Sequence, residues 1–209
     1  WGCVEASYAT GERNRIKAGG RLLVVVAEGR EAKGVRESYS PDGAPAEVRT
    51  VSPSEVAGLP NESFDDIVYF GSDKATIDAL NDKLAANGIL NIVQGGRKIG
   101  QLVSVGVGRL HYGMTRWVGT TGSDAAESYR HIPANGEIRA NDKSLVVGAG
   151  GPMGEMHVIR NICSGLPGLC IVGTDLDDRR IEGLRRKAGP MAKANGVDLR
   201  LVNPQRERL

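Results

Sequence analysis

Hydrophobic positions along this chain fall in short runs that alternate with polar segments of helical length. The first clear run, LLVVV within residues 21–29, lacks polar alternation, which is typical of a strand buried on both faces of a parallel sheet. Four further apolar segments predict strands in the first two thirds of the chain. The predicted strands span residues 21–29, 46–51, 64–72, 89–96 and 114–123.

Helical patterns lie between these strands. Residues 73–88 predict an amphipathic helix that begins at the N-cap Asp73 and stops at Gly88. Its apolar face carries Ile77, Leu80 and Leu84. Further helices are expected at residues 1–10, at residues 30–38 as a short helix interrupted by Gly34, and from about residue 124. The glycine-rich stretch 95–113 predicts a long connection, and long connections often carry function.

The last third of the chain has a more regular pattern. After a polar joint at residues 135–143, it predicts the order β-α-β-α-β. The strands are expected at 145–149, 169–174 and 197–202, and the helices at 153–163 and 178–195. The alternation predicts an α/β fold, Rossmann-like and doubly wound, with a mostly parallel sheet and helices on both faces. We expect one segment at residues 1–140 and a second at 141–209.

A glycine-rich loop, GAGGPMG, follows the first strand of the second segment. Gly148 permits a tight turn, Gly150 leaves room for a pyrophosphate to approach the backbone, and Gly154 lets the helix pack close to the strand. The helix that begins there directs free N–H groups and its positive dipole end at an anion. The spacing G-x-G-x-x-x-G is one residue longer than the usual form. The predicted loop contacts are Gly148, Gly150, Gly151, Pro152, Met153 and Gly154.

An acidic residue strengthens this interpretation. Asp175 ends the next strand, 21 residues after Gly154, where an acid accepts hydrogen bonds from the adenosine ribose. Its charge repels a 2′-phosphate and favours NAD over NADP, although Arg179 and Arg180 lie close enough to weaken that preference.

Two other interpretations of the same residues stay open. The glycines can simply form a turn while Asp175 caps a helix, or the layout can bind S-adenosylmethionine, as in methyltransferases. A short-chain dehydrogenase is disfavoured because no tyrosine has a lysine four residues later.

Composition narrows the classes of protein. The net charge of +2 and the scattered Lys and Arg residues predict no nucleic-acid surface, and no apolar run approaches the roughly 18 residues of a membrane span. The three cysteines lack CxxC spacing, which suits a reducing cytoplasm. Cys163 and Cys170 are expected to be buried thiols.

With these residues established, the chain resembles the nucleotide-binding part of the medium-chain dehydrogenase/reductase family, the zinc alcohol dehydrogenase-like proteins. The segment SLVVGAGGPMGEMHVI with CIVGTDLDDRRIEGL resembles that family's first two strands and cofactor loop. FDDIVYFGS, NGILNIVQGG and HYGMTRWVGTTGS resemble later strands, and WGCVEASY resembles the helix that enters the domain.

The order of these segments differs from the family, in which the glycine loop comes first. Here LLVVVAEGREAKG stands where a fingerprint is expected, without the glycine spacing. Either the chain holds two tandem modules, the first degenerate, or one composite sheet joins strands from both segments. Packing favours the composite sheet, because a three-stranded sheet of about 65 residues buries little apolar surface alone.

The resemblance implies an NAD(P)-dependent oxidoreductase that acts on a small-molecule alcohol or carbonyl substrate. It adds Gly71, Ser72 and Gly95 as strand ends that often contact the cofactor. The catalytic residues are unknown, a catalytic zinc is expected only in a full-length protein, and no metal ligands are assigned. Cys3 lies near a region where a ligand can occur, and His111 and His157 are candidates for polar contacts.

The resemblance also implies a homo-oligomer as one possible state, since edge strands in this family commonly pair between subunits. Because the chain starts at Trp1, we expect it to be a portion of a longer protein, with the catalytic domain outside it. The alternative function is a non-catalytic module that only binds the dinucleotide.

Overall fold

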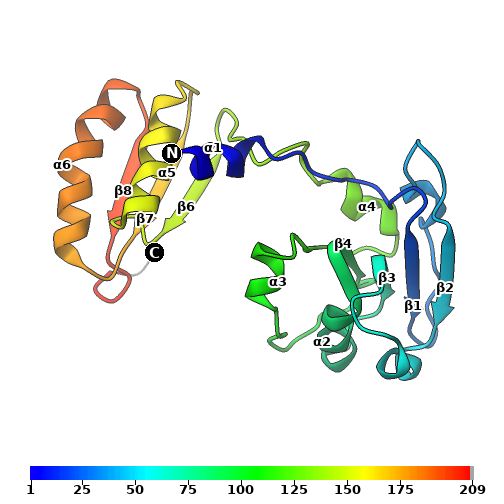
Figure 1. Cartoon of the computed structure of the whole chain (residues 1–209). Helices are drawn as coiled ribbons and strands as arrows, with labels where there is room; N and C mark the ends of the chain where they lie inside the picture. Colours follow the sequence, from blue (N-terminus) through cyan, green and yellow to red (C-terminus); the bar gives the residue numbers. More distant parts are fainter. Residues whose placement is uncertain (208–209) are drawn as a thin grey trace. The chain divides into compact units, whose positions relative to one another are not determined.

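The computed structural model describes residues 1–207 and divides the chain into two compact units (Figure 1). The five-stranded unit comprises Glu12–Ala134. The three-stranded unit comprises Trp1–Gly11 together with the chain from Asn135 onward. The boundary between the units therefore lies between Ala134 and Asn135, whereas the sequence predicted it at residue 140. The N-terminal helix belongs to the three-stranded unit.

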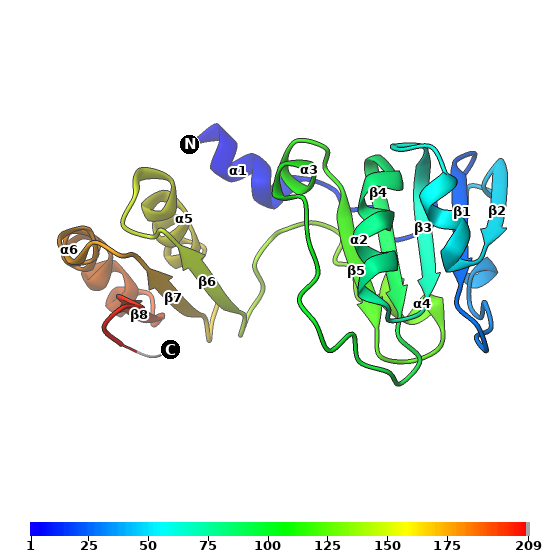
Figure 2. The same ribbon diagram turned by 90° about the horizontal axis from the view of Figure 1, so that it is seen from below.

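The five-stranded unit is an α/β structure with a fully parallel sheet in the order β2-β1-β3-β4-β5 (Figure 2). Its strands are β1 (Arg21–Val26), β2 (Glu47–Val51), β3 (Phe64–Phe70), β4 (Leu84–Val93) and β5 (Arg116–Thr120). Its helices are α2 (Lys74–Lys83), α3 (Val107–His111), α4 (Ala125–Arg130) and the 3₁₀ segments η1 (Arg36–Ser38) and η2 (Pro53–Gly58).

The absence of polar alternation in the central strands is explained by helices on both faces of this sheet. Successive side chains of a strand point to opposite faces. Leu23 therefore packs in a cluster with Ile77 of α2, while Leu22 packs in a second cluster with Tyr129 of α4. The doubly wound, Rossmann-like α/β class predicted from the sequence is confirmed here.

The three-stranded unit has the order β6-β7-β8, also parallel. Its elements are α1 (Gly2–Ala9), β6 (Lys143–Val147), α5 (Pro152–Cys163), β7 (Cys170–Thr174), α6 (Asp178–Ala194) and β8 (Asp198–Val202). Both α5 and α6 contribute to one core cluster with Ile171 and Leu201. On the opposite face of β6, Leu145 is 59% exposed and Val147 is 78% exposed.

The strands do not form the composite sheet that packing favoured. A composite sheet would place the ends of β3 and β4 beside the glycine loop. Both edges of β3 are already paired, with β1 on one side and with β4 on the other. The described strands therefore form two separate sheets and not one. In sequence, Glu12–Ala134 lies between the two parts of the three-stranded unit.

Three further expectations need correction. The helix expected to end at Gly88 stops at Lys83, because Leu84 pairs with Phe64 and is buried in the sheet, which starts β4 early. The helix expected at residues 30–38 is reduced to η1, since Gly34 has a φ of +77° that no helix allows. The predicted connection 95–113 contains α3.

Cys163 and Cys170 are more exposed than the buried thiols expected from the sequence. Cys163 is exposed and Cys170 is half-buried, and both are free thiols. Cys163 follows Ile162, which faces the core, so it lies about 100° further round α5 and points outward.

A buried ion pair supports the amino end of β3. Asp66, whose side chain is 1% exposed, accepts hydrogen bonds from Arg13 Nη1 at 2.7 and 2.8 Å and from the Lys17 backbone N–H at 2.9 Å. Burial raises the pKa of Asp66 to about 6, although Arg13 acts in the opposite direction. For its neighbour Asp65, burial also raises the pKa, but hydrogen bonds from Lys17 and Arg21 outweigh burial and lower the pKa.

The raised pKa of Asp66 predicts that stability falls as pH rises, whereas the lowered pKa of Asp65 acts in the opposite direction. The folded state holds a proton on Asp66 up to about pH 6, whereas the unfolded state loses it near its ordinary value of 3.8. The free energy of unfolding should therefore fall as pH rises between these values, by at most roughly 3 kcal/mol, and stay level above them. A carboxyl ¹³C shift titration should give a midpoint near 6 for Asp66. Asp66→Asn should abolish the fall, and Asp65→Asn should keep it. An Asp66 midpoint below that of Asp65 would contradict the assignment.

The five-stranded unit is predicted to fold when expressed as residues 12–134. Its ends lie side by side, because the Glu12 N–H donates to the Ala134 C=O at 2.8 Å, and it has its own two-faced core. We expect dispersed amide resonances and a single cooperative thermal transition. Broad, collapsed amide spectra would show that its core needs the rest of the chain.

Candidate functional site

The glycine loop leaves β6 through a tight turn and leads directly into α5. Gly148 has a φ of +72°, a conformation that favours glycine, and the Gly151 N–H donates to the Gly148 C=O at 3.0 Å. Gly151 is the N-cap of α5 and Pro152 is its first residue. The turn predicted from Gly148 is therefore present.

The amino end of α5 presents unpaired backbone amides. The first helical hydrogen bond runs from the Glu155 N–H to the Gly151 C=O at 2.8 Å. Pro152 has no N–H, so the amides of Met153 and Gly154 are those that precede the helical ladder. With the helix dipole, these two amides favour an anion at this end of the helix.

Gly154 and Gly173 allow α5 to lie close to the sheet. A Cβ atom on Gly154 would lie 2.6 Å from Ala149 Cα and 2.8 Å from Gly148 C, both backbone atoms. A Cβ on Gly173 of β7 would lie 2.9 Å from Ala149 Cβ. The role predicted for Gly154, close packing of helix and strand, matches this geometry.

Gly150 has a different role from the one expected. A Cβ there would lie 2.5 Å from Arg180 Cβ and 3.0 Å from Asp175 Oδ2. The space that Gly150 leaves free is thus occupied by α6 and by the acid of β7. Its lack of a side chain brings the loop against the start of α6.

The Asp175 carboxylate joins the glycine loop to the end of β7. Its Oδ2 accepts the Gly150 N–H at 3.1 Å, and its Oδ1 accepts the Asp177 N–H at 3.0 Å. Asp175 is 8% exposed. These bonds hold the carboxylate in one orientation and leave each oxygen a second lone pair.

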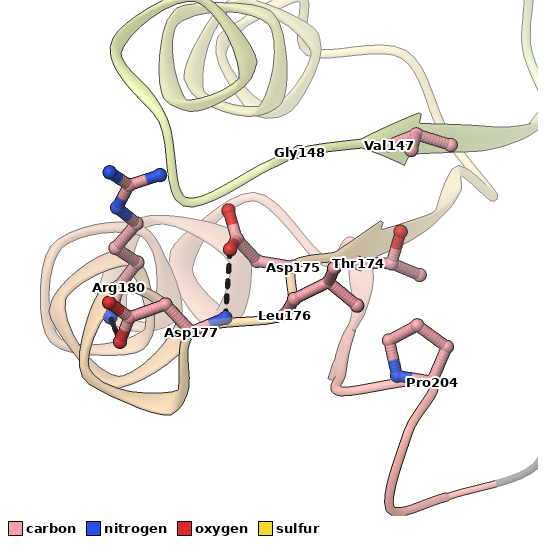
Figure 3. A pocket seen from close by; sticks show the side chains of 8 residues that line it. All are labelled: Val147, Gly148, Thr174, Asp175, Leu176, Asp177, Arg180 and Pro204. Atoms are coloured by element: carbon pink, nitrogen blue, oxygen red, sulfur yellow. Dashed lines mark hydrogen bonds between the residues drawn. The ribbon is translucent and has the colours of Figure 1, made fainter.

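A pocket of about 640 Å³ opens beside this carboxylate, at the carboxyl ends of the three strands (Figure 3). Val147 and Gly148 border it from β6, Asp175 and Leu176 from β7, and Pro204 follows β8. Leu176 is 63% exposed, which leaves an apolar side chain at the pocket rim.

The charges around the pocket are mixed. Arg180 lines it from the first turn of α6, and Figure 3 shows it on the same side as Asp177. The Arg179 backbone N–H donates to Asp177 Oδ1 at 2.8 Å, and this bond lowers the pKa of Asp177, which is therefore charged at neutral pH. The side chain of Arg179 is 94% exposed and does not line the pocket.

The other predicted cofactor contacts lie in the five-stranded unit. Gly71 and Ser72 follow β3, and Gly95 follows β4 with a φ of +57°. The Gly71 N–H donates to the Val93 C=O at 3.1 Å. The structure thus assigns these three residues to a different sheet from the glycine loop, and their contact with a dinucleotide stays a prediction.

The remaining candidates take no part in the pocket. The Nδ1 of His157 lies 2.9 Å from the Tyr8 hydroxyl, between α5 and α1. His111 is exposed, with its ring edge-on to Tyr112, and Cys3 is exposed. Residues 1–207 hold no group of three or more His, Cys, Asp or Glu side chains placed to bind a metal ion. Nor does any helix in this range have the length and apolar character needed to cross a membrane.

Sequence reasoning missed several pocket residues. These are Val147, Thr174, Leu176, Asp177 and Pro204. Their positions at the ends of predicted strands could have identified them, because the carboxyl ends of neighbouring parallel strands share one edge of the sheet. Pro204 could be included only once β8 was known to lie next to β7.

Comparisons with known proteins do not assign this chain to a family. No protein-family model matches this chain, and no curated protein matches it either.

The close approach at Gly154 predicts a selective loss of stability. Gly154→Ala should lower the free energy of unfolding of the three-stranded unit by roughly 1–3 kcal/mol, because its Cβ meets backbone that cannot rotate away. The matched control is Gly183→Ala in α6, where nothing lies within 4 Å of the added Cβ. Alanine there should be neutral or stabilise by about 0.5–1 kcal/mol through helix propensity. Urea denaturation of both variants tests this, and equal effects would contradict the packing role of Gly154.

Proposed function

We propose that the three-stranded unit binds a nicotinamide dinucleotide as the cofactor portion of an alcohol dehydrogenase-like oxidoreductase. One observation carries this proposal: the pocket beside the fixed Asp175 carboxylate is also lined by Gly148, the residue that starts the loop leading to the free amides of α5. The two features come from neighbouring parallel strands, as dinucleotide sites in doubly wound sheets require.

The dimensions and chemistry suit the adenosine and pyrophosphate part of the cofactor. A volume of about 640 Å³ falls within the range of small-molecule sites. The pyrophosphate would accept hydrogen bonds from the Met153 and Gly154 amides. The ribose hydroxyls would donate to the free lone pairs of Asp175, and the exposed Leu176 would lie against the adenine ring.

The charges favour NAD over NADP. Asp175 is held toward the pocket by two backbone amides, so a 2′-phosphate would meet a carboxylate that cannot turn away. Arg180 reduces this repulsion without removing it, because Asp177 is a second negative charge on the same rim.

The cofactor, when bound, supplies the hydride chemistry, while the residues of this chain bind and orient it. The family resemblance implies an alcohol or carbonyl compound as the substrate. Three free cysteines support a reducing cytoplasmic setting for this activity.

The decisive test is a charge placed at the N-cap of α5. Gly151 has β-region backbone angles and room for a side chain, with only Gly148 O at 3.3 Å from an added Cβ. Gly151→Asp should therefore keep or slightly raise stability, since Asp is a preferred N-cap. It should abolish NADH binding, because its carboxylate takes the amides and repels the pyrophosphate.

Isothermal titration of NADH, NADPH and S-adenosylmethionine measures this, with Gly151→Asn as the neutral control of equal shape. We expect NADH to bind the parent more tightly than NADPH, Asn to weaken binding partly, and Asp to remove it. Binding of S-adenosylmethionine alone would replace the proposal with a methyltransferase. Equal binding by parent and Gly151→Asp would show that the loop holds no phosphate.

A further inference from the structure

The five-stranded unit has a pocket of its own at the carboxyl ends of its strands. It has a volume of about 210 Å³ and is bordered by the last residues of β3 and β4 and by residues that follow β1, β4 and β5. The residues that matter for its chemistry are Arg30, Glu31, Lys33, Phe70, Val93 and Ser123.

The pocket lies where the strand order reverses. In the order β2-β1-β3-β4-β5, the chain leaves β1 toward β2 and leaves β3 toward β4, in opposite directions along the sheet. The two connections separate there and leave a crevice, which is where open α/β sheets bind ligands. Figure 2 shows β1 and β3 as neighbours at the middle of this sheet.

Hydrogen bonds from the Arg30 side chain and from the backbone connect the loops that border the pocket. Arg30 donates from Nη2 to the Gln94 C=O at 2.8 Å and from Nη1 to the Gly95 C=O at 2.9 Å. This approach needs a glycine, because a Cβ on Gly95 would lie 3.0 Å from Arg30 Cζ and closer still to Nη1. The Gly95 N–H in turn donates to the Gly122 C=O at 2.7 Å. The loops after β1, β4 and β5 are thus tied together.

The pocket carries a net positive charge. The hydrogen bonds of Arg30 go to carbonyl groups, which leave its charge uncompensated. Within residues 1–207, neither Arg30 nor the exposed Lys33 has a carboxylate within ion-pair distance. Glu31 is the one acidic residue of its lining. Phe70 and Val93, each 2% exposed, form an apolar floor beneath these charges.

We propose that this pocket binds a compact organic anion, a small molecule with one phosphate or carboxylate group. The charged group would lie between Arg30 and Lys33, with the Ser123 hydroxyl as a further donor, and the carbon skeleton would lie on Phe70 and Val93. Its volume is below the usual range of drug-sized sites, and the connection after β1 contains only the short η1. The pocket therefore lacks both the space and the helix terminus that a dinucleotide needs.

This inference is independent of the dinucleotide proposal, because every residue in it belongs to the five-stranded unit. The test uses the whole chain, labelled with ¹⁵N, and two probes in separate titrations: inorganic phosphate and butyrate, which has one carboxylate and a short carbon skeleton. We expect at least one probe to shift the amides of residues 29–33, 95–96 and 121–123 in a saturable manner. The probe that binds more tightly identifies the charged group.

Three exposed positions test the charges without disturbing the core. Lys33→Gln should weaken binding by roughly fivefold to tenfold, as expected for one charge-assisted hydrogen bond. Glu31→Gln should strengthen it, and Arg49→Gln on β2 should leave it unchanged. NADH binding should be the same in all three variants.

Two results would overturn the inference. One is that neither probe shifts these amides in the parent, even if phosphate shifts the amides of residues 148–154. The other is that Glu31→Gln and Lys33→Gln change the affinity in the same direction. Loss of NADH binding in Gly151→Asp with intact anion binding would show that the two sites are separate.

Discussion

Every strand ladder within residues 1–207 is parallel, and this constraint governs where chemistry can occur. A parallel pair needs a crossover connection, so all strands of one sheet end at the same edge. In the three-stranded unit that edge brings Gly148 of the glycine loop, Asp175 and Pro204 around one pocket. In the five-stranded unit the same constraint gathers Arg30, Phe70 and Val93. Each unit therefore has one edge at which polar loops converge above an apolar sheet.

The position of β1 decides how the chain is partitioned. Its apolar side chains are buried on both sides, so it can only lie inside a sheet covered by helices. By pairing with both β2 and β3, it completes a sheet of five strands. No edge of β3 is then left for the strands of the glycine-loop module, which form a second sheet with their own core.

The two edges differ because different structures follow their first strands. After β6 comes α5, a helix of 12 residues whose amino end offers amides to an extended phosphate group. After β1 comes only the three-residue η1, and a fixed arginine takes the place of a helix terminus. A helix dipole with free amides suits a pyrophosphate, whereas a guanidinium on a small apolar floor suits a compact anion. This difference underlies the two separate ligand proposals.

Local sequence determined the elements of this protein, and tertiary structure decided their partners. The uninterrupted LLVVV run, the N-cap Asp73 and the GAGGPMG turn each depend on neighbours a few residues away, and each was predictable. The early start of β4 depended on Leu84 finding Phe64, and the role of Gly150 depended on α6 lying against it. The exposure of Cys163 and the separation into two sheets also arise from contacts between distant segments. Turn and capping preferences act over one or two helical turns, whereas the pairing of parallel strands joins residues tens of positions apart. The partner of β3 was therefore decided by the tertiary structure, in which β1 occupies its free edge.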